Sequence, residues 1–277
     1  MTENEWDPGM PIGVFDSGIG GMTVVREIMR QLPNERVIYF GDTARVPYGS
    51  KSKETVTRYS RQIVRFLQTQ HVKAIVVACN TASACALDEL ERETDVPFIG
   101  VVKPGAKVAA RTTRNGRVGV IGTRATIGSG IYTTYIREIN PDIQVIGKAC
   151  PLFTSLVEEG LWQDPVTDEI ATRYLSELID IDIDTLILGC THYPLIRKAI
   201  ARIVGDGVAL VNPAYETALE LRELLGEHNL LNDRKPELGE NRYQFFVSDA
   251  AEKFKTFANS IIKYGILTAK TIQIEEY

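Results

Sequence analysis

Two stretches of the chain share one pattern: a short apolar run ends abruptly at a cysteine, and small polar residues follow. They are residues 74–83 (AIVVACNTAS) and 185–194 (TLILGCTHYP). The apolar runs have the length of buried strands, and residues that favour a helix come after each cysteine. Pro194, for example, suits the first position of a helix. The pattern therefore predicts that Cys79 and Cys190 both lie where a strand turns into a helix.

The rest of the chain also alternates short apolar runs with amphipathic segments, as expected for an α/β protein. Further strands are predicted at residues 11–16, 37–41, 97–102, 117–122, 143–147, 208–211, 242–248 and 271–275. Helices are predicted at residues 22–32, 52–70, 103–113, 167–180 and 213–226. One more helix follows Asp249, which we expect to cap it, and Glu158 is expected in a loop. The pattern predicts helices packed on mainly parallel sheets.

Several of these segments recur along the chain at nearly one spacing. Residues 117–123 match 11–17, and residues 143–147 match 37–41, both at an offset of 106 positions. The two strands that end in cysteine form a third match, at 111 positions. Three matches in the same order predict an internal duplication, and therefore two pseudo-symmetric α/β lobes of the same topology.

The duplication also predicts how the chain is divided between the lobes. The segment after the second cysteine helix has no partner in the repeat, and we expect it to return to the first lobe. The first lobe is then discontinuous, residues 1–101 with 210–277, and carries Cys79. The second lobe, residues 102–209, carries Cys190. Ligands bind at the carboxyl ends of parallel strands, so the active site is expected in the cleft between the lobes.

Composition and charge are those of an ordinary soluble globular protein. The 277 residues are 44% hydrophobic, and the net charge of −5 gives no reason to expect nucleic acid or a membrane as a partner. No apolar run approaches the length of a membrane span, and residues 1–11 lack the features of a signal peptide. Four cysteines without a dense framework favour reduced thiols. We expect a cytoplasmic protein in which Cys79 and Cys190 are free.

The two cysteines carry the candidate chemistry. A thiol at the start of a helix is close to backbone N–H groups that favour its thiolate. Two such thiols on opposite sides of a cleft suit a two-base proton transfer, in which one removes a proton from a carbon and the other protonates the opposite face. Such a transfer inverts the carbon, so the pattern predicts a racemase or an epimerase. His192, two residues after Cys190, and Asp16, at an adjacent strand end, are expected to tune the thiols.

No cofactor and no metal is predicted. The sequence has neither a Schiff-base lysine motif nor a phosphate-binding glycine-rich motif, and the turn at residues 18–21 lacks the spacing of a dinucleotide site. A zinc site from Cys79, Cys190, His192 and Asp16 is chemically possible. No closely spaced pair of ligands supports it.

Four short motifs resemble, in their order and spacing, those of the glutamate racemases, in the aspartate/glutamate racemase family. They are Asp16-Ser17-Gly18, Pro47-Tyr48-Gly49, Cys79-Asn80-Thr81 and Cys190-Thr191-His192. The resemblance implies cofactor-independent interconversion of L-glutamate and D-glutamate in a cleft between two α/β lobes, and a supply of D-glutamate for bacterial peptidoglycan. It implies that Cys79 acts on D-glutamate and Cys190 on L-glutamate. It also makes a homodimer a reasonable expectation.

The resemblance implies roles for neighbouring residues as well. Besides the two cysteines, Asp16, His192 and Glu158 are expected to assist catalysis. The positions expected to contact the substrate are Asp16, Ser17, Pro47, Tyr48, Gly49, Asn80, Thr81, Thr123, Thr126, Thr191 and His192.

Simpler interpretations stay open for some of these residues. Asp16 could merely cap the helix that follows its glycine turn, which is compatible with a role in the site. Pro47 and Tyr48 could be turn residues only. Glu158 could be an exposed carboxylate near a helix end.

Other functions also stay open. An aspartate racemase would use the same paired cysteines, and a catalytically silent binding module could keep the cleft without turnover. A cysteine hydrolase or transferase needs one nucleophile, whereas this chain has a second thiol at the equivalent point. Cys85 and Cys150 have no such context, and we expect them to be small hydrophobic residues.

Overall fold

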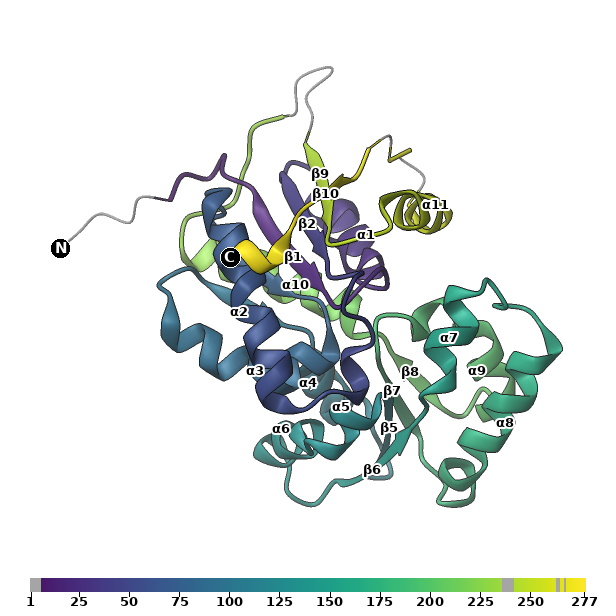
Figure 1. Ribbon diagram of the computed structural model, residues 1–277. Helices are drawn as coiled ribbons and strands as arrows, with labels where there is room; N and C mark the ends of the chain where they lie inside the picture. The colour runs from purple at the N-terminus through teal and green to yellow at the C-terminus, as the bar shows by residue number, and fades with distance from the viewer. Residues whose placement is uncertain (1–5, 236–241, 263–264, 267) are drawn as a thin grey trace.

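The structure is a computed structural model that describes residues 6–235, 242–262, 265–266 and 268–277. Its larger sheet is parallel throughout and forms the centre of the first lobe, with the strand order β10-β9-β2-β1-β3-β4 (Figure 1). The strands are β1 (Ile12–Asp16), β2 (Val37–Gly41), β3 (Ala74–Val77), β4 (Phe98–Gly100), β9 (Tyr243–Val247) and β10 (Lys270–Thr271). Since β9 pairs with β2, the C-terminal part of the chain returns to the first sheet.

The smaller sheet forms the centre of the second lobe and is also parallel, with the order β6-β5-β7-β8. Its strands are β5 (Arg117–Gly122), β6 (Gln144–Ala149), β7 (Thr185–Gly189) and β8 (Ala209–Val211). This order repeats the order β2-β1-β3-β4 of the first sheet. Ile12 pairs with Ala74 in the first sheet and Val118 with Thr185 in the second, which keeps the predicted offsets of 106 and 111 positions. The predicted fold class is confirmed, and the lobe boundaries at 101/102 and 209/210 stay a prediction.

Helices cover both faces of each sheet. They are α1 (Met22–Gln31), α2 (Lys53–Thr69), α3 (Asn80–Glu93), α4 (Val102–Thr112), α5 (Arg124–Gly128), α6 (Ile131–Ile139), α7 (Leu152–Glu158), α8 (Pro165–Asp180), α9 (Arg197–Val204), α10 (Pro213–Glu227) and α11 (Ala251–Ile261). Short 3-10 helices are η1 (Tyr48–Ser50), η2 (Tyr193–Ile196) and η3 (Ile274–Glu276).

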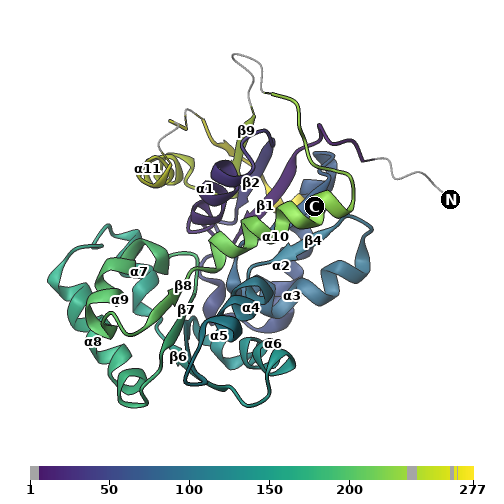
Figure 2. The same cartoon turned by 180° about the vertical axis from the view of Figure 1, so that it is seen from behind.

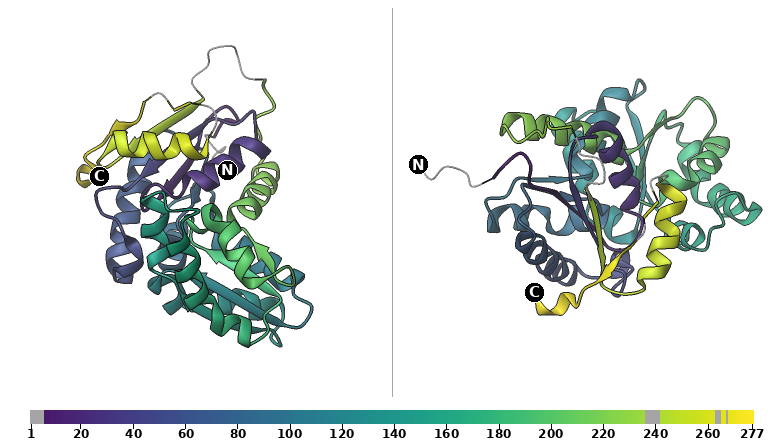
Figure 3. Two further views of the ribbon diagram at one scale, coloured as in Figure 1. Left: turned by 90° about the vertical axis from the view of Figure 1, so that its right-hand side faces the viewer. Right: turned by 90° about the horizontal axis from the view of Figure 1, so that it is seen from above.

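The alternation of side chains along the strands explains the three layers of each lobe, because neighbouring residues point to opposite faces. In the first lobe Ile12 and Val14 pack with α1, α10 and α11, whereas Phe15 packs with α2 and α3. In the second lobe Val118 packs with α4 and α6, whereas Ile121 packs with α7, α8 and α9. Figure 3 shows α2 and α11 on opposite sides of the first sheet, and Figure 2 shows α10 crossing the back of the molecule, where it contacts α1 and α4.

Several local predictions are wrong. Helices α5, α6 and α7 lie where the pattern predicts none, and Glu158 ends α7 instead of lying in a loop. After Cys190 the chain forms the 3-10 helix η2, with Pro194 as its second residue, before α9 begins. Asp249 does not cap α11, which begins after Ala250 in a left-handed conformation without a side-chain cap.

Two predictions about strands also need correction. The strand predicted at 271–275 is the two-residue β10, followed by η3. The match between β2 and β6 is shifted from the predicted offset of 106, because Val145 takes the place of Val37, at an offset of 108. In both cases the local pattern of apolar residues does not determine the strand register. Pairing with the neighbouring strand determines it.

A buried ion pair joins four segments of the first lobe. Lys73 and Glu35 lie 2.6 Å apart, with side chains 0% and 1% exposed. The Lys73 ammonium also donates to the carbonyl oxygens of Pro8 and Leu230, and Glu35 accepts from the backbone N–H of Asn232. Burial lowers the pKa of Lys73, and Glu35 opposes that shift. The pair therefore ties the N-terminal segment and the segment after α10 to the starts of β2 and β3.

Replacing Glu35 by glutamine should lower the free energy of unfolding by about 3–5 kcal/mol, because the Lys73 ammonium is left buried without its counter-charge. Urea unfolding followed by circular dichroism measures the change. The control is Glu93→Gln, which removes a partly exposed partner of Arg61 and should cost at most about 1 kcal/mol. Equal losses in the two variants would contradict the prediction.

Candidate active site

The carboxyl ends of the central strands bring the predicted residues together between the lobes. Asp16 ends β1 and Cys79 follows β3, whereas Thr123 follows β5 and Cys190 follows β7. The two lobes touch here, since the hydroxyls of Thr81 and Thr123 lie 2.9 Å apart. The strand-to-turn positions predicted for both cysteines are confirmed.

Cys79 is buried, 5% exposed, and caps the start of α3. Its Sγ accepts a hydrogen bond from the backbone N–H of Ala82 at 3.4 Å and donates to Oγ of Ser17 at 3.5 Å. Burial raises the pKa of Cys79 to about 12, and the negative charge of Asp16 adds to the shift. Ser17 and Ala82 act in the opposite direction but do not offset it. The N–H of Ala82 at the helix start favours the thiolate of Cys79, as expected, but burial outweighs it in the free protein.

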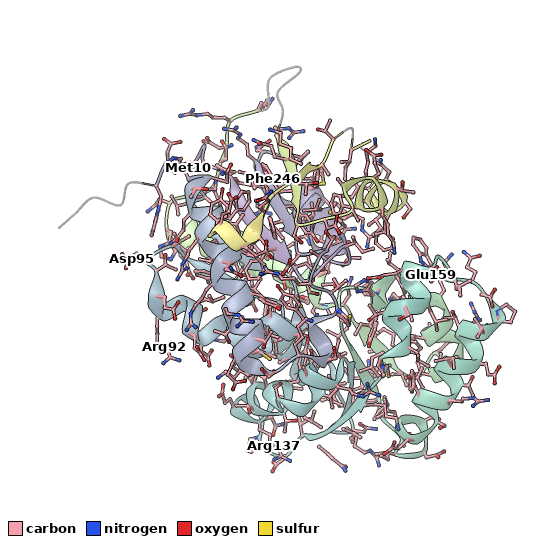
Figure 4. The ribbon with its side chains drawn as sticks, in the orientation of Figure 1. Met10, Arg92, Asp95, Arg137, Glu159 and Phe246 are labelled. Atoms are coloured by element: carbon pink, nitrogen blue, oxygen red, sulfur yellow. The ribbon has the colours of Figure 1, made fainter. Side chains whose placement is uncertain are left out.

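Cys190, 7% exposed, has different neighbours. Its Sγ lies 3.7 Å from Nδ1 of His192 and 3.9 Å from Oγ1 of Thr154. The other ring nitrogen of His192, Nε2, lies 3.1 Å from Oε1 of Glu158. Glu158 ends α7, and the next residue, Glu159, is labelled in Figure 4 on the side of the second lobe that faces the first.

The contacts of His192 favour its charged form. Burial alone would lower the pKa of His192, but the hydrogen bonds with Cys190 and Glu158 raise it to about 10. Burial opposes ionisation of Glu158 as well, yet the contact with His192 holds the pKa of that carboxyl below its usual value. His192 and Glu158 therefore form an imidazolium–carboxylate pair at neutral pH. The two thiols occupy equivalent places in the fold, but an anion, Asp16, lies near Cys79 and a cation beside Cys190.

Asp16 closes the turn before α1 with one carboxylate oxygen and leaves the other without a partner among the described residues. Its Oδ2 accepts hydrogen bonds from the backbone N–H groups of Gly18 and Gly21, at 3.3 and 2.9 Å, which closes the turn before α1. Its Oδ1 is buried and has no hydrogen-bond partner among the described residues. Burial raises the pKa of Asp16, and His192 acts against the shift. An unpaired buried carboxylate oxygen suits a cationic donor such as the ammonium group of an amino acid.

Three threonine hydroxyls meet where the lobes touch. Oγ1 of Thr81, on α3 of the first lobe, lies 2.9 Å from Oγ1 of Thr123 and 3.1 Å from Oγ1 of Thr126. The last two hydroxyls lie 3.0 Å apart. Gly49 permits this approach, because a Cβ atom there would lie 2.5 Å from the Cβ of Thr123. The cluster can offer hydroxyl donors to a carboxylate.

A second set of contacts joins the lobes on the other side of the thiols. The hydroxyl of Tyr132 donates to Oδ1 of Asn80 at 2.7 Å, and the hydroxyl of Thr23 donates to the carbonyl oxygen of Thr191 at 3.0 Å. Gly20 also lies against the second lobe, since a Cβ atom there would be 2.4 Å from Oγ1 of Thr191. Predicted residues from both lobes are therefore brought together at one place.

The segment that carries Pro47, Tyr48 and Gly49 is anchored by a buried carboxylate. Asp42 accepts hydrogen bonds from Nε of Arg45 at 2.7 and 3.0 Å, from the hydroxyl of Tyr48 and from Oγ of Ser248 at 2.8 Å. The Val46–Pro47 peptide bond is cis. Tyr48 is 1% exposed, and its hydroxyl donates to the carboxylate of Asp42. Tyr48 therefore has a structural role in this segment, which is the simpler interpretation that the sequence leaves open.

A cavity of about 240 Å³ opens beside this segment. It is lined by residues of both lobes: Val46, Pro47, Gly49, Ser50, Thr123, Arg124, Pro151, Thr154, Ser155 and Glu158. Thr154 contacts the thiol of Cys190, and Thr123 belongs to the threonine cluster. The cavity therefore lies beside two groups of the site, the threonine cluster and the neighbour of the Cys190 thiol.

Sequence reasoning missed four residues of this region: Asp42, Arg45, Tyr132 and Thr154. A signal existed for Asp42, which follows β2 directly at the same edge where Asp16 ends β1. Tyr132 and Thr154 lie on α6 and α7, which the pattern does not predict.

Two other features are absent from the part of the chain that the structure describes. No group of three or more histidine, cysteine, aspartate and glutamate side chains there is arranged to hold a metal ion. No helix there has the length and apolar character needed to cross a membrane.

Comparison with known proteins agrees with this geometry. The model of the Asp/Glu/Hydantoin racemase family matches residues 12–220. The chain belongs to this family. A glutamate racemase from Geobacter metallireducens is 50% identical over 97% of this chain and 99% of its own length.

Solved structures of the family have the same fold. The crystal structure of glutamate racemase from Francisella tularensis in complex with D-glutamate has a TM-score of 0.90 at 41% identity, covering 98% of this chain and 100% of that one. Glutamate racemase from Bacillus anthracis also has a TM-score of 0.90, at 39% identity, covering 95% of this chain and 97% of that one. The resemblance predicted from the four motifs is confirmed, and the protein is an enzyme of the racemase class. The roles of single residues stay predictions.

Replacing Glu158 by glutamine should lower the pKa of His192, because a neutral amide no longer stabilises the imidazolium. A pH titration of the histidine ring nitrogens by NMR measures the shift. We expect kcat/KM for racemisation to fall as His192 loses its charge, so the fall should occur at lower pH in the variant than in the parent enzyme. In the parent protein, charged His192 adds to the free energy of unfolding. This contribution is complete below about pH 6.5 and is lost as the pH rises through about 10. In the variant the contribution should be lost at lower pH.

The matched control is Glu159→Gln, which removes the neighbouring exposed carboxylate and should leave the titration of His192 unchanged. A His192 pKa that stays raised in Glu158→Gln would show that the carboxylate does not stabilise the imidazolium.

Replacing Gly20 by alanine should push the lobes apart, because the added methyl group would lie 2.4 Å from Thr191 and 2.6 Å from the ring of His192. Misplacing reacting groups by about 1 Å can cost about a hundredfold in rate, so we expect kcat/KM to fall by at least about tenfold. The control is Gly207→Ala, where a methyl group meets no atom within 4 Å. Steady-state kinetics of both variants would decide, and equal activity would argue against close packing at Gly20.

Proposed function

We propose that the protein interconverts L-glutamate and D-glutamate without a cofactor, by proton transfer at the α-carbon between Cys79 and Cys190. The observation that carries the proposal is the pair of buried thiols at equivalent strand ends of two duplicated lobes. They are near enough to interact electrostatically. A hydrolase or transferase would need only one of them.

The protonation states support a division of roles. From L-glutamate, a Cys190 thiolate takes the α-proton, and the Cys79 thiol gives its proton to the opposite face of the carbon. Cys79 is then a thiolate and Cys190 a thiol, which is the state that the reverse reaction needs. The raised pKa of Cys79 keeps that thiol protonated in the free enzyme, and His192, whose pKa is raised to about 10, places a positive charge beside Cys190.

The remaining predicted residues would hold the substrate. The unpaired oxygen of Asp16, next to Ser17, would accept the substrate ammonium. This ammonium would offset the negative charge that raises the pKa of Cys79, and so prepare that thiol to act as a base on D-glutamate. Asn80 and Thr81 stand at the start of α3, where free N–H groups and the helix dipole favour a carboxylate.

Other residues would complete the contacts to the substrate. The hydroxyls of Thr123 and Thr126 lie beside Thr81, and Thr191 lies between Cys190 and His192. Pro47, Tyr48 and Gly49 would place backbone groups at the mouth of the cleft, with Tyr48 acting as the anchor of this segment.

Glutamate is the favoured substrate because the relatives described above are glutamate racemases and one of them holds D-glutamate. An aspartate racemase remains the nearest alternative, and a catalytically silent binding module the alternative outside enzymology. The supply of D-glutamate for peptidoglycan, a cytoplasmic location and a homodimer belong to the proposal as expectations from the family.

The test is proton NMR with L-glutamate or D-glutamate in deuterated buffer without added cofactor, followed by chiral analysis. Each enantiomer should lose its α-proton signal and give the other. Replacing Cys79 or Cys190 by serine should lower the rate about 10²–10⁴-fold, because a hydroxyl is a far weaker acid than a thiol. Cys85→Ser is the control, since Cys85 lies outside the site, and it should keep normal turnover.

The two enantiomers of glutamate are equally stable in water, so kcat/KM must fall equally in the two directions in each variant. A serine variant at either site with normal turnover would contradict the two-thiol mechanism. Inversion of aspartate but not of glutamate would overturn the substrate assignment, and inversion of neither would favour the binding module.

A further inference from the structure

Tyr132 connects the two strand ends that carry the thiols. It lies on α6 of the second lobe, and its hydroxyl donates to Oδ1 of Asn80, the residue after Cys79. Both side chains are buried, with Tyr132 3% and Asn80 4% exposed. The ring of Tyr132 packs against the end of β7, since a Cβ atom on Gly189 would lie 3.3 Å from its Cε2, and Cys190 is the next residue.

The hydrogen bond to Asn80 has a defined direction. Burial raises the pKa of Tyr132, and Cys190 adds to the shift, so the hydroxyl keeps its proton and can donate. A donor at Oδ1 decides which edge of the amide faces Tyr132, and the two N–H groups of Nδ2 lie on the other edge. Among the described residues Nδ2 of Asn80 makes no hydrogen bond.

We infer that Tyr132 is a positioning residue, which holds Oδ1 of Asn80 so that Nδ2 faces the carboxylate of the bound amino acid. The inference rests on the proposed function. A carboxylate accepts hydrogen bonds but does not donate them, so only the N–H edge of the amide can bind it. The start of α3 attracts the same anion through its free backbone N–H groups.

The position of Tyr132 links this orientation to the contact between the lobes. Its ring belongs to the core of the second lobe, beside Gly189 on one side and near Gly105 of α4 on the other, where a Cβ atom would lie 3.6 Å from Cε1. The ring therefore moves with the second lobe, whereas Asn80 moves with the first. If the lobes separated, the amide would be free to turn over. Contact between the lobes thus determines both the distance between the thiols and which edge of the Asn80 amide faces the substrate.

The experiment compares Tyr132→Phe with the parent enzyme by steady-state kinetics from L-glutamate and from D-glutamate. The variant keeps the packed ring and removes the donor. Loss of one hydrogen bond to a substrate-binding group should lower kcat/KM about tenfold. The control is Tyr135→Phe on the same helix, where the tyrosine is partly exposed and its hydroxyl makes no hydrogen bond within the part of the chain that the structure describes. This control should keep the parent rate.

A double-mutant cycle distinguishes positioning of Asn80 from a general structural effect. In the background of Asn80→Ala, where the amide is absent, Tyr132→Phe should cause no further loss of kcat/KM. Thermal unfolding of all variants checks that they are folded. Calorimetric titration of D-glutamate into Cys79→Ser, with and without Tyr132→Phe, provides a second readout without turnover, and the added change should weaken binding.

Each result has one meaning. A parent enzyme that racemises glutamate and a Tyr132→Phe variant within twofold of it would overturn the inference and leave the proposed function intact. The inference would also be overturned if Tyr132→Phe lowered kcat/KM equally with and without the Asn80 amide. Binding of D-glutamate to Cys79→Ser that does not weaken when Tyr132→Phe is added would overturn it as well. A parent enzyme that does not racemise glutamate would overturn the proposed function itself, and the inference with it.

Discussion

Close contact between the two lobes at the carboxyl ends of their central strands is the constraint on which the rest of the structure depends. Both thiols, the carboxylate of Asp16 and the threonine cluster lie at these ends, so a change in the distance between the sheets alters every distance that joins groups of the two lobes. The contact is possible because glycines stand where the backbones approach: Gly20 faces Thr191, and Gly49 faces Thr123. The hydroxyls of Thr81, Thr123 and Thr126 meet in this contact, and buried hydrophobic side chains of both lobes belong to one continuous cluster. The molecule obtains its buried site from this approach more than from a deep cavity within either lobe.

Duplication supplies equivalent positions, but burial makes them chemically unequal. Cys79 lies near a carboxylate in a dry site and is held as a thiol, whereas Cys190 lies beside an imidazolium that Glu158 supports. A two-base transfer between mirror-image substrates needs one base and one acid at any moment. A strictly symmetric site would have no preference for either state. The different charges beside the two thiols, a carboxylate near Cys79 and an imidazolium beside Cys190, make this site unsymmetric.

The sequence predicted the features that repeat or that end a strand, and it could not predict those that arise from packing between distant segments. Cys79, Cys190 and Asp16 were predictable because an apolar run stops at each of them. Helices α5, α6 and α7 were missed because glycines and β-branched residues give that part of the chain a weak local preference, which packing overrides. The partners of Glu158 and Asn80 are therefore visible only in three dimensions. Burial also outweighs one local effect, that of the helix start on the thiol of Cys79.

The order of elements along the chain has a consequence for the synthesis of the protein. All four strands of the second sheet are available once residue 211 has left the ribosome, whereas β9, which covers the edge of β2, begins only at Tyr243. The second lobe can thus be complete while the first still lacks two strands. For most of its synthesis the nascent chain carries β2 as an open sheet edge, the kind of surface that pairs with foreign strands. Pairing with β9 closes that edge, so a product truncated before Tyr243 would keep β2 as an open strand edge.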